Sequence, residues 1–260
     1  MKANWKLALM CLATLAMVAC NDKNPADQDP TVDPIVDPTV DPIDDTYTPP
    51  IDVTDKSLAD WDKLDQSKVA VDVLTATSPY WDALKKIQVY ADSICIFYAL
   101  TFDPEAITAP TETAGFHIYI NADNDPNTGG FWDLFAPANK GNCDLMFEGT
   151  LWNAFGEQTS YLPPHISYWS GATGGDQWNW TEFAQIDERV SMSQFVEDGI
   201  VEGYLIRDLI PWKKWSDAFE IGFDIYDDNY TEVGLLPQGD ATDGGQQIGR
   251  KPKLQVTFDE

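Results

Sequence analysis

Short runs rich in β-branched and aromatic residues recur along most of the chain, separated by clusters of Gly, Pro, Asn and Asp. Apolar alternation bounded by turn-forming residues is typical of β-strands. We predict ten strands, at Val69 to Leu74, Ile87 to Ala91, Ile94 to Thr101, Gly115 to Asn121, Cys143 to Gly149, His165 to Ser170, Trp178 to Ala184, Ile200 to Ile206, Phe219 to Tyr226 and Lys253 to Phe258. So many short strands must bury their apolar faces mainly against one another.

Helical patterning is thin by comparison. It is confined to Ser57 to Leu64, Pro104 to Ile107 and Arg207 to Trp215. Ile94 to Leu100 is apolar on both faces, which indicates a central strand with cover on both sides, and Ala91-Asp92-Ser93 before it predicts a tight hairpin turn. The predicted fold is all-β, a two-sheet jelly-roll β-sandwich with short peripheral helices. Residues 51–260 are long enough for one such domain.

The first twenty residues have the composition of a secretory signal. A basic start precedes an apolar run from Leu7 to Val18, followed by Ala19-Cys20. The run holds 12 residues, whereas a membrane-spanning helix needs about 20, so we expect it to be cleaved. Met17-Val18-Ala19-Cys20 resembles a bacterial lipobox, which makes residues 1–19 a lipoprotein signal peptide and Cys20 the lipidated first residue of the mature chain. An ordinary secretory signal that contains a cysteine is the alternative.

Residues 20–50 contain an Asp-Pro repeat that begins at Asp29 and ends near Asp45. Proline at every fourth position forbids helices and sheet ladders, and the aspartates repel one another, so we expect an extended, solvated stalk. Thirty residues at roughly 3 Å each would reach about 90 Å from the lipid. A leader of no consequence is the alternative. Asn21 and Asp22 after the cysteine resemble the acidic start of surface-exported lipoproteins of Bacteroidota-type bacteria.

Charge limits the partners of the chain. The 43 acidic residues outnumber the 16 basic ones, giving a formal net charge of −27. Nucleic acid and anionic lipid headgroups carry the same sign and would be repelled, so we expect no nucleic-acid partner. We expect the acyl chains on Cys20 to anchor the protein in the outer membrane, at the cell surface or on the periplasmic face.

A loop after Gly115 to Asn121 carries side-chain oxygens at alternate positions, Asn121, Asp123, Asp125 and Asn127. Such spacing gathers hard ligands for Ca²⁺, so these four residues are the candidate site for a structural calcium ion. The loop is not an EF-hand, since its sixth position is Pro126 and its twelfth is Trp132. The alternative is an Asx-rich turn in which the side chains bond nearby backbone amides.

This stretch carries a family resemblance. A strand that ends in Asn121-Ala122-Asp123-Asn124 with Thr128-Gly129, followed by Gly141-Asn142-Cys143-Asp144, resembles family 9 carbohydrate-binding modules and related DOMON-like β-sandwiches. Ala59 to Leu64, Trp178 to Trp180 and Glu202 to Ile206 are similar to other segments of that pattern, except that Arg207 replaces the usual proline. The resemblance implies a jelly roll that binds saccharide, often with structural calcium.

Ten tryptophans independently favour sugar binding. The apolar C–H face of a sugar ring lies flat on an aromatic ring, while nearby carboxylates and amides bond its hydroxyls. The candidate ligand-binding residues are Trp132, Trp152, Trp169 and Trp178, with Asp176, Gln177 and Asn179 as polar neighbours. Core packing is the alternative for each tryptophan, and we expect it for Trp180 and for Trp61, Trp81, Trp212 and Trp215.

The remaining chemistry is sparse. Cys95 and Cys143 either form a disulfide or are two separate buried thiols. The only histidines are His117 and His165, so no zinc-site spacing is present. With 43 acidic residues, carboxylate pairs such as Glu148/Glu157 and Asp224/Asp227 arise by chance, and no nucleophile elbow or phosphate loop accompanies them.

The sequence therefore predicts a membrane-anchored, non-catalytic module that binds a glycan or oligosaccharide, within a polysaccharide-uptake system. The alternative is a surface adhesion or assembly subunit whose exposed aromatics face a protein partner. Two exposed tryptophans across a groove would favour sugar, and a flat apolar patch would favour protein.

Overall fold

The computed structural model describes residues 47–75, 82–107, 114–125, 127–130, 142–151, 165–175, 178–182, 192–197, 199–207, 215–227, 229–237, 241–243, 246–248 and 254–259. The chain divides into two units, Met1–Pro42 and Ile43–Glu260. The predicted signal peptide and most of the predicted stalk lie outside the described residues, as does nearly all of the helix predicted at Arg207 to Trp215.

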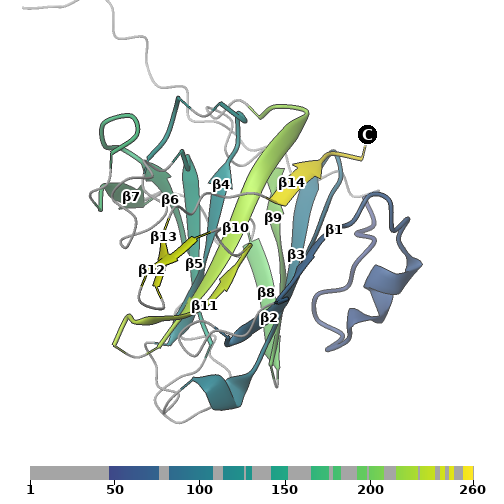
Figure 1. Cartoon of the computed structure of the whole chain (residues 1–260). Helices are drawn as coiled ribbons and strands as arrows, with labels where there is room; N and C mark the ends of the chain where they lie inside the picture. The colour runs from purple at the N-terminus through teal and green to yellow at the C-terminus, as the bar shows by residue number, and fades with distance from the viewer. Residues whose placement is uncertain are drawn as a thin grey trace, which may run out of the picture. The chain divides into compact units, whose positions relative to one another are not determined.

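Two antiparallel sheets face each other in the second unit (Figure 1). The five-stranded sheet has the order β1-β2-β3-β9-β8, and the seven-stranded sheet has the order β11-β10-β4-β5-β6-β7, with β14 paired to β10. The first sheet consists of β1 Ala70–Val73, β2 Leu84–Ala91, β3 Cys95–Phe102, β8 Met192–Glu197 and β9 Ile200–Ile206. The second consists of β4 Gly115–Asn121, β5 Leu145–Thr150, β6 His165–Trp169, β7 Trp180–Glu182, β10 Ala218–Tyr226, β11 Glu232–Leu236 and β14 Leu254–Thr257.

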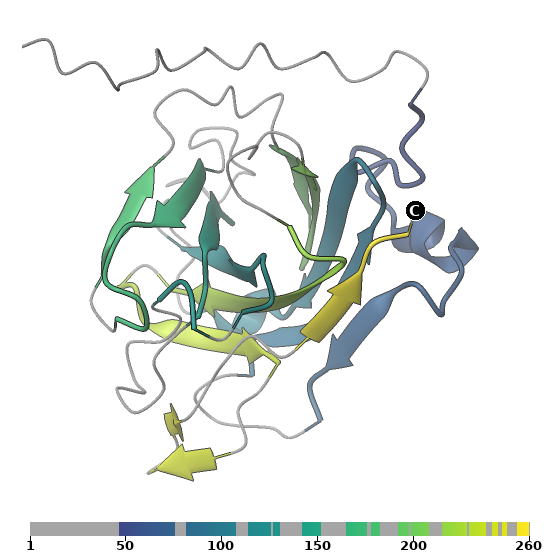
Figure 2. The ribbon, with the colours of Figure 1, turned by 90° about the horizontal axis from the view of Figure 1, so that it is seen from above.

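Small elements complete the unit. Two 3-10 helices, η1 Leu58–Lys63 and η2 Pro104–Ala106, occupy the first two predicted helical stretches. The hairpin of β12 Ala241–Asp243 and β13 Gln246–Ile248 stands out from the sandwich near β10 and β11 (Figure 2). The predicted all-β two-sheet sandwich is confirmed.

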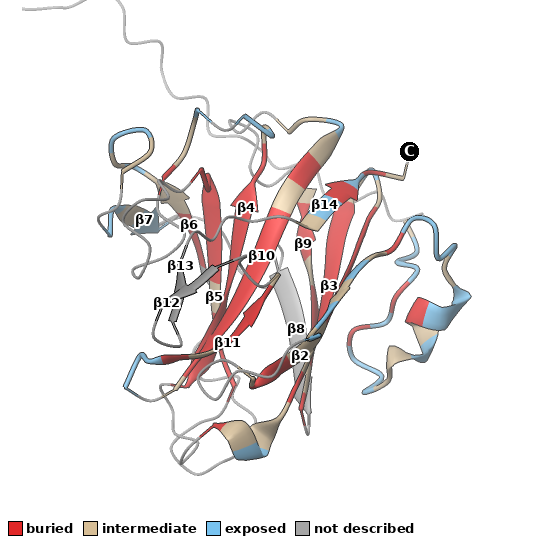
Figure 3. Cartoon of the chain, in the orientation of Figure 1, coloured by how far each residue is buried: buried red, intermediate tan, exposed pale blue. Residues whose placement is uncertain are grey.

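The main core lies between the sheets and contains the inward residues of their central strands (Figure 3). In β4, Phe116, Ile118 and Ile120 point into this core. A strand places alternate residues on opposite faces, so His117, Tyr119 and Asn121 lie on the outer face of the seven-stranded sheet.

The central strand β3 has cover on both faces, as predicted. Ile96, Tyr98 and Leu100 belong to the main core, whereas Cys95 and Phe97 belong to a second cluster under the segment that carries η1. At the predicted hairpin turn, Asp92 accepts hydrogen bonds from the backbone N–H groups of Ile94 and Cys95 at 2.8 and 2.7 Å. The carboxylate thereby satisfies the donors of the turn.

Candidate functional site

A histidine lies between two carboxylates on the outer face of the seven-stranded sheet. In the strand register, His117 of β4 is opposite Asp224 of β10 on one side and Glu148 of β5 on the other. The His117 Nδ1 atom is 2.8 Å from an Asp224 oxygen, and its Nε2 atom is 3.7 Å from Glu148 Oε1. The backbone N–H of His117 also donates to Asp224. Both ring nitrogens therefore face negative charge.

The two carboxylates change the charge state of this histidine. Burial of His117, which is 8% exposed, lowers the pKa of the imidazole, but attraction and hydrogen bonding to Asp224 and Glu148 outweigh burial and raise the pKa to about 10. His117 is therefore an imidazolium at neutral pH. One positive and two negative groups leave this row with a net charge of −1.

Tyr226 extends the row at the end of β10. Its hydroxyl donates to Glu148 Oε1 at 3.1 Å, and its ring stacks on His117 with the centroids 4.6 Å apart. Burial and the neighbouring Glu148 raise the pKa of the Tyr226 hydroxyl, so it remains a donor. Gly115 is the register partner of Tyr226, and a Cβ atom at Gly115 would collide with the Tyr226 hydroxyl and the Gly149 carbonyl.

Aromatic rings continue from this point in both directions, and we call the series the aromatic band. Tyr230 stacks on Tyr226 at 5.5 Å, and Trp178 meets the His117 ring edge-on at 6.0 Å. Tyr119, Trp180 and Trp169 complete the band. Their ring centroids are 5.5 Å apart between His117 and Tyr119, 6.1 Å between Tyr119 and Trp180, and 5.3 Å between Trp180 and Trp169. Trp178 and Tyr230 are 51% and 67% exposed, so the band presents two large rings to solvent.

The predicted ligand-binding residues are divided by the structure. Trp178 is the exposed tryptophan of the band, and Asn179 beside it is also exposed. Trp169 is partly buried: its Nε1–H donates to the Ala172 carbonyl at 3.1 Å, and its ring fills space that a Cβ atom at Gly130 would need. Trp169 is therefore the partly buried ring at one end of the band. The other four predicted residues, Trp132, Trp152, Asp176 and Gln177, lie outside the described residues.

The predicted calcium loop uses three of its four side chains on itself, because Asn127 Nδ2 also donates to Asp125 at 2.9 Å. Asp123 accepts from the Asp125 backbone N–H at 3.0 Å, and Asp125 accepts from the Asn127 backbone N–H at 2.8 Å. Thr128 adds its hydroxyl to Asp123. These contacts are those of the Asx-rich turn, the alternative given above. Asn121 belongs to a different set of contacts, with Glu220 and Asn142.

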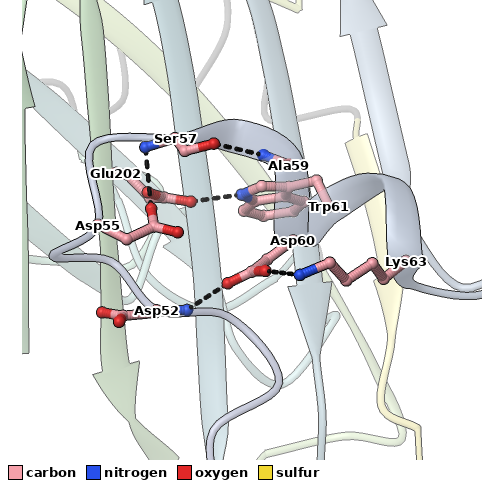
Figure 4. Close-up of polar contacts among 8 residues, drawn as sticks. All are labelled: Asp52, Asp55, Ser57, Ala59, Asp60, Trp61, Lys63 and Glu202. Carbon is pink, nitrogen blue, oxygen red and sulfur yellow. Dashed lines mark hydrogen bonds and ion pairs between the residues drawn. The ribbon is translucent and has the colours of Figure 1, made fainter.

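A buried tryptophan on the five-stranded sheet has a structural role. Trp61 of η1 is 1% exposed, and its Nε1–H donates to Glu202 Oε1 of β9 at 2.6 Å (Figure 4). The predicted packing of Trp61 between helix and sheet is confirmed. In the same segment, the Asp60 carboxylate accepts from Lys63 Nζ and from the Asp52 backbone N–H (Figure 4). Glu202 is fully buried, and burial followed by the nearby aspartates raises its pKa to about 7.

Two other tryptophans carry indole N–H groups with no partner among the described residues. Trp215 packs edge-on against Phe219 and Phe258, as predicted, and Trp180 packs on Tyr119. Trp180 is partly exposed and belongs to the aromatic band, and it packs against the buried cluster that contains Tyr119 and Cys143. Trp81 and Trp212 lie outside the described residues.

The two cysteines of the sandwich are free thiols. Cys95 contacts the cluster beneath η1, and Cys143 contacts Tyr119 and Met146 on the outer face of the other sheet. The alternative of two separate buried thiols is therefore confirmed. Burial raises the pKa of the Cys95 thiol to about 12, which keeps it protonated and unreactive.

Two further findings concern metal ligands and membrane spans. Among the described residues, no three His, Cys, Asp or Glu side chains lie close enough to share a metal ion. None of the helices formed by those residues has the length and apolar character needed to cross a bilayer.

Most of the polar groups at the band were not predicted from the sequence. The carboxylate pairs that the sequence offered were Glu148 with Glu157 and Asp224 with Asp227, but the strand register instead brings Glu148 and Asp224 to the two sides of His117. The alternation of residues in β4 already predicted that His117 lies on the face of the strand opposite to that of Phe116. The pairing partners were hidden because they come from strands about 30 and 100 positions further along the chain.

Comparison with known proteins gives neighbours among solved structures. No family model matches the sequence, and no curated protein matches it. The solved structures that resemble it include a family 9 carbohydrate-binding module from Caldicellulosiruptor kristjanssonii in complex with cellotriose, with 12% identity, a TM-score of 0.39, and coverage of 82% of this chain and 90% of that chain. A complex of such a module from the same organism with glucose has 12% identity, a TM-score of 0.38, and coverage of 82% and 92%. The fold class itself is given by the strand pairing of this chain.

Proposed function

We propose that this protein binds a neutral glycan at the aromatic band, without catalysis. The observation that carries the proposal is the placement of two half-exposed rings, Trp178 and Tyr230, beside the His117 row. Exposed aromatics of this size next to fixed carboxylates form the combination that a sugar needs, because a sugar has an apolar face and a polar rim.

The exposed rings and the carboxylate of Glu148 would contribute to sugar binding in different ways. Covering about 100 Å² of an indole face contributes on the order of 2 kcal/mol, so stacking on Trp178 and Tyr230 together supports a weak to moderate affinity. Glu148, partly exposed, offers a carboxylate oxygen whose position is held by the Tyr226 hydroxyl. A carboxylate accepting from a sugar hydroxyl adds a charge-assisted hydrogen bond and fixes the orientation of the ring.

Charge selects the class of glycan. The His117 row carries a net charge of −1, and the whole chain carries −27. A uronic acid or sulfated sugar would approach against this field. The proposed ligand is therefore an uncharged oligosaccharide.

The proposal includes the cellular setting expected from the sequence. Lipidation at Cys20 would anchor the chain in the outer membrane, and the stalk would hold the sandwich away from it, as a glycan-capturing component of a polysaccharide-uptake system requires. The same exposed rings would serve an adhesion or assembly subunit, with a protein as the ligand.

The test is binding of the full-length protein to an array of neutral and acidic glycans. We expect a defined neutral oligosaccharide to bind, and Trp178→Ala and Tyr230→Ala each to weaken binding at least tenfold. Val73→Ala is the matched control, because it removes an exposed apolar side chain from β1 of the other sheet. Equal binding by all variants would contradict the proposed site, and an array without any signal would favour the protein ligand, to be sought by cross-linking on intact cells.

A further inference from the structure

The two exposed rings of the aromatic band are separated by two buried rings. Tyr230 stacks on Tyr226 at an interplanar angle of 18°, and His117 stacks on Tyr226 at 29°. Each face of an aromatic ring has room for one stacked partner, so His117 and Tyr230 take opposite faces of Tyr226. Trp178 meets His117 edge-on, at 62°. A single sugar ring, which is about the size of one aromatic ring, therefore covers Trp178 or Tyr230 and does not reach both.

The stretch between the two exposed rings presents a polar group and little ring surface. His117 and Tyr226 are buried, so neither gives a sugar a face to cover. The carboxylate of Glu148 lies between them, because its Oε1 accepts from the Tyr226 hydroxyl at 3.1 Å and is 3.7 Å from His117 Nε2. Glu148 is partly exposed, and a carboxylate accepts more than one hydrogen bond. The order along the band is therefore ring, carboxylate, ring.

The turn that carries Tyr230 holds its ring in place. Tyr230 has a φ of 55°, in the left-handed region that a bulky residue seldom adopts. Such a conformation persists only where its surroundings determine it. Here the Asp227 carboxylate accepts from the backbone N–H groups of Asn229 and Thr231, at 2.8 and 2.9 Å. The Asp227 carbonyl accepts from the Tyr230 N–H at 3.0 Å. The turn thus fixes the backbone of an exposed ring.

The backbone beside Trp178 is held as well. The carbonyl of Asn179 accepts from both the backbone N–H and the hydroxyl of Ser170, each at 2.9 Å. Ser170 directly follows β6, so these bonds attach the Trp178 segment to the seven-stranded sheet. Groups that are fixed before binding lose less conformational entropy when a ligand arrives. Both exposed rings are therefore organised in advance of binding.

We propose that the aromatic band binds an internal stretch of a glycan chain, at least three units long, with Trp178 and Tyr230 under different units and Glu148 beside the unit between them. The inference rests on the glycan binding proposed above and specifies which part of the glycan is bound. Because the three contact points follow one another in a series, they match a ligand that extends in both directions better than they match a single terminal sugar.

Such a ligand joins two weak sites into one stronger site. Once one unit lies on Trp178, the covalent chain holds a later unit near Tyr230, and the second contact forms at a high effective concentration. Affinity should therefore rise steeply when the ligand becomes long enough to reach both rings. The chemistry of the chain ends should matter little, because neither end needs to contact the band.

The test is titration calorimetry of the full-length protein with the one- to six-unit series of β-1,4-linked glucose, of β-1,4-linked mannose and of β-1,4-linked xylose. In a series that binds, we expect the hexasaccharide to bind at least tenfold tighter than the monosaccharide. Tyr230→Ala should remove this gain, whereas the monosaccharide still has Trp178 and should lose no more than about twofold. Reduction of the end sugar of the hexasaccharide to its open-chain alditol should change the affinity by no more than about twofold.

Val73→Ala, in β1 of the other sheet, is the matched control and should keep both the affinity and its dependence on length. Circular dichroism shows whether each variant keeps its β structure. Equal affinity for the monosaccharide and the hexasaccharide, or loss of binding on reduction of the end sugar, would overturn this inference and leave the glycan site intact. Absence of binding to all three series and to the glycan array would contradict the glycan site itself and this inference with it.

Discussion

At the scale of single residues, His117 is the most consequential side chain of the outer face. A buried ion needs opposite charge and hydrogen bonds to compensate for lost hydration, and both Asp224 and Glu148 supply them. The charged imidazole in turn keeps the two carboxylates near each other. The row is therefore a rigid support for the rings of Tyr226 and Trp178 as well as a polar surface.

The raised pKa of His117 gives a direct prediction. The protein has two histidines, so NMR can follow both imidazoles in one titration. We expect one set of ring signals to remain constant through pH 8 and to titrate near 10, as the pKa of His117 requires. Because the folded pKa is above the usual 6.5, this interaction stabilises the fold fully below pH 6.5 and is lost as pH rises through 10. Asp224→Asn should move the high midpoint down, and two midpoints near 6.5 in the wild type would contradict the arrangement.

Glu202 predicts pH dependence in the opposite direction. Burial of Glu202 raises its pKa to about 7 from the usual 4.5, so the folded state binds more protons than the unfolded state between these values. Stability attributable to Glu202 is therefore highest below pH 4.5 and falls as pH rises to 7. We expect Glu202→Gln, which keeps an acceptor for the Trp61 N–H, to flatten this part of the dependence of the unfolding temperature on pH. An unchanged slope in the variant would show that Glu202 is ionised in the fold at pH 5.

How far the site could be predicted differs from residue to residue. Trp178 was predicted as a ligand-binding residue, with core packing as the alternative, and its ring is exposed. The partly buried position of Trp169 could not be predicted, because it depends on Gly130 and on the Ala172 carbonyl, which reach the ring only in the folded chain. A tryptophan count indicates a capacity for stacking, and only packing shows which faces stay open.

At the scale of elements, β4 is where the core and the aromatic band meet. Its bounds and those of β9 agree with the prediction, because both have a long apolar run and a clear boundary. Four strands, β8, β11, β12 and β13, were not predicted. In β11, Glu232 begins the strand and Gly234 interrupts it, and this glycine is needed where the backbone of Leu84 approaches. Such a strand is determined by tertiary contact and carries little local signal.

Gly115 at the start of β4 allows a test of how the band is supported. A methyl group there meets the Gly149 carbonyl and the Tyr226 ring, so we expect Gly115→Ala to cost about 1 to 3 kcal/mol of unfolding free energy. Tyr226→Phe removes the hydroxyl that meets the methyl group. The double variant should therefore lose less than the sum of the two single variants in chemical denaturation. Additive losses would mean that the backbone contact with Gly149 alone determines the cost.

At the scale of the whole molecule, the sandwich follows residues 20–50, for which the sequence predicts an extended stalk. The order of the strands within each sheet could not be predicted from the sequence, because β3 pairs with β9 and β4 pairs with β10 over about 100 residues. The composition of residues 20–50, in contrast, is informative without any structure, since proline at every fourth position of the Asp-Pro repeat predicts neither helix nor sheet ladder.

This division makes the membrane anchor separable from the glycan site. We expect Cys20→Ala to move the protein from the membrane fraction to the soluble fraction and to abolish labelling by a radioactive fatty acid, because the acyl chains on Cys20 would be the proposed attachment. Cys11→Ala is the matched control: it changes a cysteine within the predicted signal peptide and should leave both properties intact. Glycan binding by the released Cys20→Ala protein should equal that of the wild type, since the aromatic band lies entirely within residues 115–230. A Cys20→Ala protein that stays on the membrane would mean that the apolar run from Leu7 to Val18 itself is retained as the anchor.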